Sequence, residues 1–534
     1  MALEYRFLVD TLRDYSFAGY ANDVTIYTKS ATFKSGALSA YDAIAASSYM
    51  EIKLSNANGD FNLQDSTSKY YGKLRRGTLV KAQASLNGSN WTTLSVLKIS
   101  DIIPVYSMKG DHDVILKCSD VLKGFLNQDF VAPLQTNVRI DEILDAIHAT
   151  AKAIYPYESY YQFFGHSSIG DGRSPFDGGV WADFETAETT LPFYGDNLDR
   201  GQGVKAGQYI KDAVQAEIFG LYWFSPRSER FRFLSRYHAS DTAISWYLNT
   251  TITDVPVYSY ARDLVNDFAL GYFPRAIGAA NSVLWASDNV PFQLNAQETR
   301  RIAVKYRDPN QASASVGALV VDDLIRGVDF IANSEADGSG TDWTHFLTVT
   351  LLKGTATSEI VFYNRKIGDP AYITTLQVKG TPITAYNKEI AYGYNDDSIV
   401  GEGDNPDLGN DRASSSETLF AISDIDFAQA YADFKVNAFG DPLYVIEHLT
   451  IPVKSDDIVT QTQVLTRSIG DVINFTDPAN AHDLDYMIVG ESHSITPQTT
   501  PPTHTVVYTL RPTNRGGLFI LDESTYGGGD IFSF

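Results

Sequence analysis

Two glycine-containing stretches resemble motifs that carry chemistry, but each lacks one required residue. The stretch GHSSIG at 165–170 places Ser167 two residues after a glycine, as in a nucleophile elbow, yet Ile169 stands where the second glycine is required. The stretch GQGVKAG at 201–207 has the first two glycines of a dinucleotide-binding fingerprint, yet Ala206 replaces the third and no strong strand precedes it. We therefore expect loops at both places, with no catalytic and no cofactor-binding residue.

The acidic segment 395–411 offers the carboxylate and carbonyl oxygens that Ca²⁺ prefers. If Asp404 took the first position of an EF-hand loop and Gly409 the turn position, Ser415 would stand where the closing glutamate belongs, and two ligand positions would hold Pro and Leu. The segment is therefore not an EF-hand. We favour a solvated loop, and Ca²⁺ binding of another kind stays open.

The nine histidines include no HExxH motif and no closely spaced pair. His493 and His504 are placed to face each other across a C-terminal hairpin, where they would form a metal site or, as we favour, a structural pair. A glycosidase needs two carboxylates at a defined separation, and 65 acidic residues neither point to one nor exclude it. We assign no metal-binding residue and no cofactor.

The tryptophans have two interpretations. They could form platforms that bind sugars, but Trp in β modules is more often partly buried core, which we favour. The four concerned are Trp181, Trp223, Trp246 and Trp343.

The charge and composition restrict the partners. The 42 Lys and Arg residues against 65 Asp and Glu give a net charge of −23, so the average surface repels duplex nucleic acid and anionic bilayers. An acidic channel that DNA crosses without adhering is compatible with this charge. The single cysteine, Cys118, excludes a disulfide framework. The first residues lack a signal-peptide pattern and no segment approaches roughly 18 apolar residues, so we expect synthesis in a cytoplasm and no membrane span.

The elements that would position any site are mostly strands, as expected for a chain with 13% aromatic residues. Alternating runs predict strands at 77–86, 91–103 and 112–118, with Asn87-Gly88 as a hairpin turn. Helices are expected in RIDEILDAIHATAKAIYP (139–156), at 207–218 and near 424–438. A hairpin turning at 225–228 follows the second helix. Several short strands at 285–385 predict a sandwich of immunoglobulin-like type, 393–417 reads as a loop or crossing connection, and 458–521 reads as a β region.

The two ends of the chain contain similar patterns. Gly77–Pro104 and Gly470–Pro497 are both 28 residues long and align without a gap, with five identities that include both glycines and both prolines. One residue fewer after the proline then aligns His112 with His504. Either any two three-stranded meanders look this similar, or the chain carries duplicated barrel-type modules. If the modules are duplicated, a trimer carries six similar modules. A ring with three-fold symmetry can then match a partner with six-fold symmetry.

Four segments, in order along the chain, share their pattern with one known family. They are RRGTLVKAQASLNGSNWTTLSVLKISDI followed by CSDVLKGF, KDAVQAEIFGLYWFSPRSERFRFLSRY, NRKIGDPAYITTLQVKGTPI, and LTRSIGDVINFTDPANAHDLDYMIVGESHSITPQTTPPTHTVVYTLRP. They resemble, respectively, the first tube-forming barrel, a helix with its hairpin, the end of an inserted sandwich, and the C-terminal barrel of tail hub (baseplate hub or tail-tip) proteins of tailed bacteriophages and related injection machines.

The resemblance implies a mainly β (α+β) fold with two tube-forming β-barrel modules, an intermediate α+β region and an inserted immunoglobulin-like β-sandwich. The expected divisions are 1–125, a first tube-type barrel module; 126–205, an intermediate α+β region; 206–284, a helix-hairpin region contributing to the second barrel and the intermediate domain; 285–385, the inserted sandwich; 386–440, a connecting loop and helix; and 441–534, the C-terminal part of the second barrel.

The function implied is structural and not enzymatic. It is a homotrimeric ring with pseudo-six-fold symmetry in a virion tail tip or baseplate, made in the host bacterial cytoplasm. The ring would continue the tail tube, contact tube and distal tail proteins, carry adhesins, tail fibres or tip proteins, hold the tape-measure protein in its lumen and let DNA pass. No lysozyme or peptidase domain is recognisable, which puts a wall-degrading role in doubt. A phage adhesin or carbohydrate-binding protein is the alternative, followed by a polysaccharide-degrading enzyme.

Overall fold

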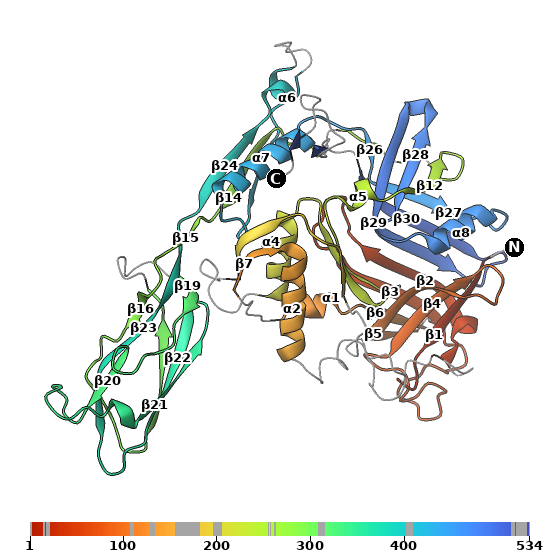
Figure 1. Cartoon of the computed structure of the whole chain (residues 1–534). Helices are drawn as coiled ribbons and strands as arrows, with labels where there is room; N and C mark the ends of the chain where they lie inside the picture. The colour runs from red at the N-terminus through yellow and green to blue at the C-terminus, as the bar shows by residue number, and fades with distance from the viewer. Residues whose placement is uncertain are drawn as a thin grey trace.

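Figure 1 shows the computed structural model of the chain. The structure describes residues 3–13, 17, 22–106, 112–128, 134–154, 182–195, 205–254, 256, 258–260, 263–307, 316–401, 409–513, 518–519 and 531–532. Strands predominate among them, so the predicted mainly β class is confirmed. Within these ranges, no helix is both long and apolar enough to cross a membrane.

One sheet of 11 strands joins the two ends of the chain. Its order is β1 (Glu4–Val9), β4 (Leu79–Ser85), β5 (Thr92–Tyr106), β6 (His112–Ser119), β3 (Ala46–Ser55), β2 (Thr28–Gly36), β29 (His482–Thr496), β28 (Val472–Asp477) and β12 (Ile244–Asn249). In addition, β30 (Thr503–Pro512) pairs with β29 and with β27 (His448–Pro452). Figure 1 shows the N-terminal strands in red beside the C-terminal strands in blue. The two modules predicted at the chain ends therefore share one sheet.

Alternation along the strands explains why this sheet covers a core. In β3 the buried side chains of Met50, Ile52 and Leu54 alternate with more exposed residues. Because successive side chains of a strand point to opposite faces, this part of the sheet has one apolar and one polar face. Residues 94–97 of β5 and 486–491 of β29 are instead buried on both faces. Below, the two faces are called the core face and the open face.

A mixed α and β region lies beside the sheet. It contains α1 (Leu122–Leu126), α2 (Ile140–Ile154), α4 (Ala206–Ala216), β7 (Gln135–Arg139), β8 (Ala182–Phe184), β9 (Thr190–Tyr194) and the hairpin of β10 (Leu221–Ser225) and β11 (Arg230–Leu234). The helix predicted within 139–156 is confirmed, and its apolar residues Ile140, Ile143, Leu144 and Ile147 are all buried. The helix predicted at 207–218 and the turn after Ser225 are confirmed as well.

A three-stranded sheet and a helix lead away from this region. The strand β14 (Asp267–Tyr272) lies between β24 (Glu389–Tyr394) and β25 (Ser414–Thr418), and α7 (Ile425–Phe439) packs on β14 and β24. Asp424 caps α7 by accepting the N–H groups of Asp426 and Phe427, which satisfies donors that a helix start leaves without partners.

A β-sandwich projects from this arm and lies apart from the large sheet (Figure 1). Its strands are β16 (Ser282–Ala286), β17 (Phe292–Leu294), β18 (Thr299–Lys305), β19 (Val316–Val321), β20 (Phe330–Asn333), β21 (Leu347–Lys353), β22 (Thr357–Asn364) and β23 (Ala371–Ala385). The long strand β23 pairs with β16, β17, β19 and β20, and β22 pairs with β18 and β21. The two sheets enclose one apolar core whose fully buried members all lie between Leu284 and Val378.

Smaller elements complete the described chain. They are the helices α5 (His238–Asp241) and α6 (Asp396–Val400), the 3₁₀ turns Thr25–Tyr27, Thr344–Phe346 and Pro478–Asn480, and the strands β13 (Tyr258–Ser259), β15 (Arg275–Ile277), β26 (Val445–Ile446), β31 (Leu518–Phe519) and β32 (Ile531–Phe532).

Two sequence-based expectations are wrong in part. The segment 458–521 begins with a helix, α8 (Ile458–Thr466), and not with a strand. Asp457 starts this helix by accepting the Thr460 N–H at 3.0 Å, and its Val464 and Leu465 are buried. The expected connection at 393–417 contains the end of β24, all of α6 and most of β25, because β25 is held by parallel pairing with β14.

Candidate functional site: the join between two sheet units

The large sheet contains the same four-stranded unit twice. The N-terminal unit consists of β3, β4, β5 and β6, and the C-terminal unit of β27, β28, β29 and β30. In each, the first strand in sequence lies at one side of a three-stranded meander and pairs with its last strand. All of these pairings are antiparallel. The repeat seen in the sequence is thus a repeat of topology.

Both units interrupt the same ladder at the same place. Between β5 and β6 the register shifts directly after the pair Ile99–Cys118. Between β29 and β30 it shifts directly after Ile488–Leu510. In each case the long strand holds one extra residue, a β-bulge that bends the strand and re-aims the side chains that follow.

The repeated glycines have a structural reason. Gly77 has φ +87° and Gly470 φ +101°, a backbone region that favours glycine. The N–H of Gly77 donates to Ile99 O at 2.7 Å, and that of Gly470 donates to Ile488 O at 2.8 Å. Each glycine therefore fixes its first strand to the residue that precedes the bulge.

The gap-free alignment of the two ends is wrong after the first turn. Leu79 pairs with Lys98, whereas Val472 pairs with Met487, so the separation of the paired residues falls from 19 to 15. The first hairpin of the C-terminal unit is thus four residues shorter. A shift of this kind is invisible to an alignment that matches only the corner residues.

The strand ladders give the correct equivalences. Ile102 corresponds to Glu491, since both follow the bulge by the same number of residues, and does not correspond to Ile495 as predicted. In the third strand His112 corresponds to His504, as predicted, because β6 and β30 keep the same spacing from the bulge.

The two units meet where β2 pairs with the second half of β29, from Ala31–Ile495 to Gly36–Gly490. The backbones approach closely at the last pair. A Cβ atom at Gly36 would overlap the Val489 carbonyl oxygen, and one at Gly490 would overlap the Ala37 carbonyl oxygen. This strand pair, called the join below, therefore depends on glycine at both positions.

A buried ion pair lies at the join. Glu491 is on β29, and Arg227 comes from the turn between β10 and β11. The guanidinium and the carboxylate are 3.1 Å apart, with side chains 14% and 4% exposed, and Arg227 also donates to Leu465 O of α8 at 3.0 Å. Burial acts to raise the pKa of Glu491, but the charge of Arg227 and a hydrogen bond from His493 outweigh it and hold the pKa below its ordinary value.

The two predicted histidines do face each other. His493 Nδ1 lies 3.0 Å from His504 Nε2, and His493 Nε2 lies 3.5 Å from the Glu491 carboxylate. Since a carboxylate only accepts, His493 carries its proton on Nε2, and His504 then donates from Nε2 to His493 Nδ1. Burial lowers the pKa of both histidines, so both are neutral at pH 7.

Aromatic rings of the N-terminal half enclose this pair. Phe33 of β2 stacks on His493 with ring centroids 4.6 Å apart, and Tyr5 of β1 meets His504 edge-on at 5.5 Å. Both histidines are almost completely buried. With a paired carboxylate and two buried imidazoles, the arrangement can hold the strands in register.

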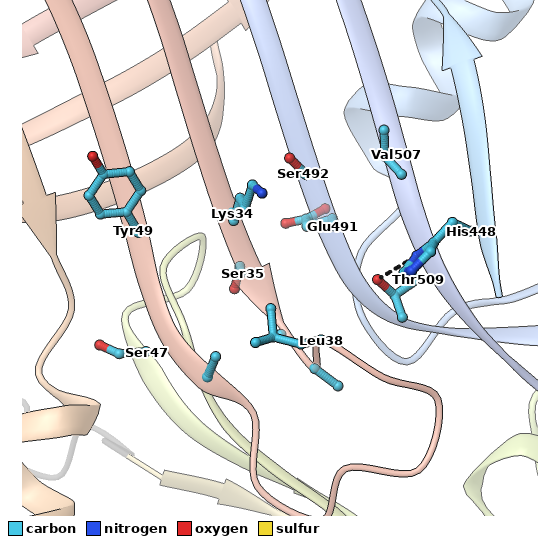
Figure 2. A pocket seen from close by; sticks show the side chains of 13 residues that line it. Lys34, Ser35, Leu38, Ser47, Tyr49, His448, Glu491, Ser492, Val507 and Thr509 are labelled. Carbon is cyan, nitrogen blue, oxygen red and sulfur yellow. Dashed lines mark hydrogen bonds between the residues drawn. The ribbon is translucent and has the colours of Figure 1, made fainter.

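A shallow hollow of about 460 Å³ lies at the same join. Figure 2 shows Lys34 and Tyr49 on neighbouring strands of the N-terminal half, and Ser492, Thr509 and His448 on those of the C-terminal half. Thr509 and His448 form a hydrogen bond of 3.4 Å. The lining combines polar side chains with apolar ones such as Leu38 and Val507 and comes from both halves of the sheet, so the hollow exists only while the join is made.

The other sites predicted from the sequence lie partly outside the described residues. The stretch 165–170 and residues 201–204 lie outside the described residues, as do 402–408 of the acidic segment and Trp181. Trp223 and Trp246 are buried, which confirms core packing for these two. In the described ranges no three His, Cys, Asp or Glu side chains group as a metal site would require.

Sequence reasoning missed the ion pair at the join. Arg227 stands in a hairpin turn, where a charged residue reads as exposed, and no pattern connects it to Glu491, 264 positions away in the sequence. The glycines gave a usable signal, because glycine within a strand marks a bulge or a close backbone approach.

Comparisons with known proteins gave the following results. No family model matches the chain, and no curated protein matches it in sequence. Among solved structures, the tail protein from Neisseria meningitidis MC58 is 10% identical, with 95% of this chain and 97% of that one covered and a TM-score of 0.40. The 43 kDa tail protein of prophage MuSo2 from Shewanella oneidensis is 8% identical, with 96% and 99% covered and a TM-score of 0.44. The Francisella PdpA–VgrG complex is 8% identical, with 96% of this chain but 52% of that chain covered and a TM-score of 0.35. The structural neighbours of this chain are tail proteins and VgrG-containing assemblies.

Proposed function

We propose that the chain is the structural hub of a phage tail tip or baseplate, a homotrimeric ring that extends the tail tube. One observation carries this proposal. Two units with the same strand order and the same bulge stand side by side in one continuous sheet. Three copies of the chain would place six such units around an axis, which is the number needed to continue a six-fold tube from a three-fold ring.

The open face of the sheet is the surface that would line the channel, because the other face is occupied by core. In its N-terminal half it carries hydroxyl side chains and charges of both signs. The charged residues are Lys34, Lys53 and Lys117 beside Glu51, Asp101 and Asp113. Asp113 bonds to both Lys29, at 2.6 Å, and Lys53, at 3.1 Å. Paired charges and hydroxyl groups favour weak adhesion of DNA. In this part of the channel, the pairing of opposite charges would therefore keep DNA from adhering, in place of the uniformly acidic lining expected from the net charge.

The remaining parts have roles in the same proposal. The sandwich, taken as immunoglobulin-like, projects from the arm of β14, β24 and α7 (Figure 1), and it would anchor adhesins, tail fibres or tip proteins outside the ring. The channel would hold the tape-measure protein before ejection and pass DNA during it, in a virion assembled in a bacterial cytoplasm. The divisions 1–125, 126–205, 206–284, 285–385, 386–440 and 441–534 are proposed as the domains. The role is structural, without a catalytic step.

Mass measurement and imaging test this proposal. A trimer has a mass of about 177 kDa, three times the 58.9 kDa of one chain, and mixing with tube protein should stabilise it. Electron micrographs should then show a ring with six similar sheet units around a channel. A chain that stays monomeric in the presence of tube protein, or that turns over a host polysaccharide, contradicts the hub.

One feature favours a second candidate, a carbohydrate-binding adhesin. On the edge strand β24, three apolar or aromatic side chains lie exposed in a row, Ile390 at 44%, Tyr392 at 62% and Tyr394 at 52%. Exposed rings in line can stack on sugars. Binding on a glycan array that Tyr392→Ala abolishes would favour this candidate, and an array without signal would count against it.

A further inference from the structure

The repeated unit leaves one strand edge without a partner. In the C-terminal unit, β29 pairs with β28 through its first half and with β2 through its second half. In the N-terminal unit, β5 pairs with β4 through its first half. The second half of β5, Asp101–Tyr106, pairs with β6 along one edge. Along its other edge, in the position that β2 takes beside β29, the described part of the chain supplies no strand. The open edge of β5 is thus the counterpart of the occupied edge of β29.

The backbone groups on this edge can be assigned. His112 O accepts from Asn56 N–H, so His112 points toward β3, and the alternate residues of β6 point toward β5. The pair Val105–Asp113 is therefore hydrogen-bonded within the sheet, and the neighbouring residues on β5 direct their N–H and C=O groups outward. Those residues are Ile102, Pro104 and Tyr106.

Two local features limit how a partner strand can bind. The Ile102 N–H is held by its neighbour's carboxylate, Asp101 Oδ1, at 2.9 Å, and Pro104 has no N–H to donate. A partner strand must replace the Asp101 carboxylate and place no acceptor opposite Pro104, which restricts its register. The side chains at the end of this edge are exposed and apolar, with Tyr106 at 66% and Val105 at 36%. An exposed strand edge is a template for pairing, and Pro104 and the preceding bulge limit which strands can add to this one.

We propose that a second copy of this chain adds a strand to the open edge of β5 at Asp101–Tyr106, as β2 does to β29 within one chain. The matching surface is the other end of the sheet, beyond β27. There Thr450 directs its backbone outward and accepts from Asp254 N–H at 3.0 Å. Within one chain, β2 lies beside β3 and pairs with β29 at the join. Since β27 is the strand of the C-terminal unit that corresponds to β3, the surface beside β27 takes the place that β2 has beside β3. Pairing of this kind joins copies head to tail, and it rests on the ring proposed above.

A photo-crosslinking amino acid at position 106 tests this pairing. The matched control is position 392, since Tyr392 is 62% exposed against 66% for Tyr106 and also lies on an edge strand, β24, outside the large sheet. Irradiation of the assembled protein should cross-link position 106 to residues 250–256 or 446–454 of another copy, with little product from position 392. Equal yields from both positions, or cross-links from position 106 to other segments, overturn the proposal.

A side-chain variant gives an independent measurement. Val105→Lys should weaken association at least about tenfold while the melting temperature of the separated chain stays unchanged, because this side chain is exposed in the single copy and is paired with Asp113. If a ring assembles normally with Val105→Lys and position 106 gives no cross-link, this pairing is wrong and the hub proposal stands. If neither a ring nor a cross-link forms with tube protein present, the strand pairing and the hub proposal both fail.

Discussion

Gly36 of β2 and Gly490 of β29 face each other as the last pair of the join, and a Cβ at either position would overlap the backbone of the other strand. Gly36 also has φ +90°, where an L side chain is strained. The two halves of the sheet can approach only because both residues lack a side chain.

Gly36→Ala should therefore destabilise the sheet more than a glycine replacement that adds strain alone. Gly59 has φ +76°, and no atom lies within 4 Å of the point where a Cβ would stand, so Gly59→Ala should cost about 1–2 kcal/mol. Gly36→Ala should cost about 3 kcal/mol or more, since it adds a steric overlap. Pulse proteolysis across a urea series measures both, and equal losses would mean that the close approach contributes nothing.

The ion pair of Arg227 and Glu491 should have a large effect when one partner is removed. Glu491→Gln leaves a buried guanidinium without its counter-charge, for which about 3–5 kcal/mol is typical. Replacing both residues, with Arg227→Met added, should recover part of this loss. The exposed pair Arg301–Glu359, with side chains 65% and 35% exposed, is the matched control, and Glu359→Gln should cost less than about 1 kcal/mol. Urea midpoints that change equally in both single variants would contradict a special role for the buried pair.

Much of the fold could be predicted from local pattern. The three strands of the N-terminal meander, the helix α2 and the hairpin after α4 follow from alternation, helical periodicity and turn residues, and the structure confirms them. The repeat was visible in part for the same reason, since Gly77 and Gly470 stand at the same corner before the first strand of each meander. The aligned prolines are not equivalent, because Pro104 lies within β5 whereas Pro497 follows β29.

The pairing of the two ends could not be predicted, because it depends on contacts between residues far apart in sequence. Nothing in β2 names β29 as its neighbour, and the position of a bulge is set by the ladder and not by one residue type. The helix α8 was missed since its apolar residues Val464 and Leu465 are adjacent and few, so that the segment resembles a strand.

The sandwich should fold when it is separated from the rest of the chain. Its fully buried core residues all lie between Leu284 and Val378, and its two ends are adjacent, with Gly278 N–H donating to Pro382 O at 2.8 Å. A fragment covering 276–384 should therefore give a cooperative thermal transition and dispersed NMR signals. In the rest of the chain, replacing residues 278–382 with a short Gly-Ser linker between 277 and 383 should leave the large sheet intact. A fragment without a transition would mean that the arm is needed for its fold.

The buried histidines predict how stability depends on pH. Burial lowers the pKa of His493 and His504, and that of His148 to about 3. For a histidine whose pKa is lower when folded, the unfolded chain binds protons first as the pH falls below about 6.5, so stability is complete above that pH and declines below it. Each such residue contributes a slope of about 1.4 kcal/mol per pH unit between about 6.5 and its folded pKa. Glu491 adds to the loss only at lower pH, since its pKa is depressed below that of an ordinary Glu.

His238 has the opposite sign. Burial acts to lower its pKa, but the hydrogen bond and charge of Glu185 outweigh this and raise it, so its contribution is present below about pH 6.5 and is lost as the pH rises through the folded pKa. Stability should therefore be greatest near neutral pH and fall below about pH 6.5. His504→Gln should make the decline below pH 6.5 shallower, whereas His345→Gln, at an exposed position of the sandwich, should leave it unchanged. Melting temperatures measured from pH 8 to pH 5 decide this, and a decline that is identical in both variants would show that the His493–His504 pair does not govern the acid sensitivity.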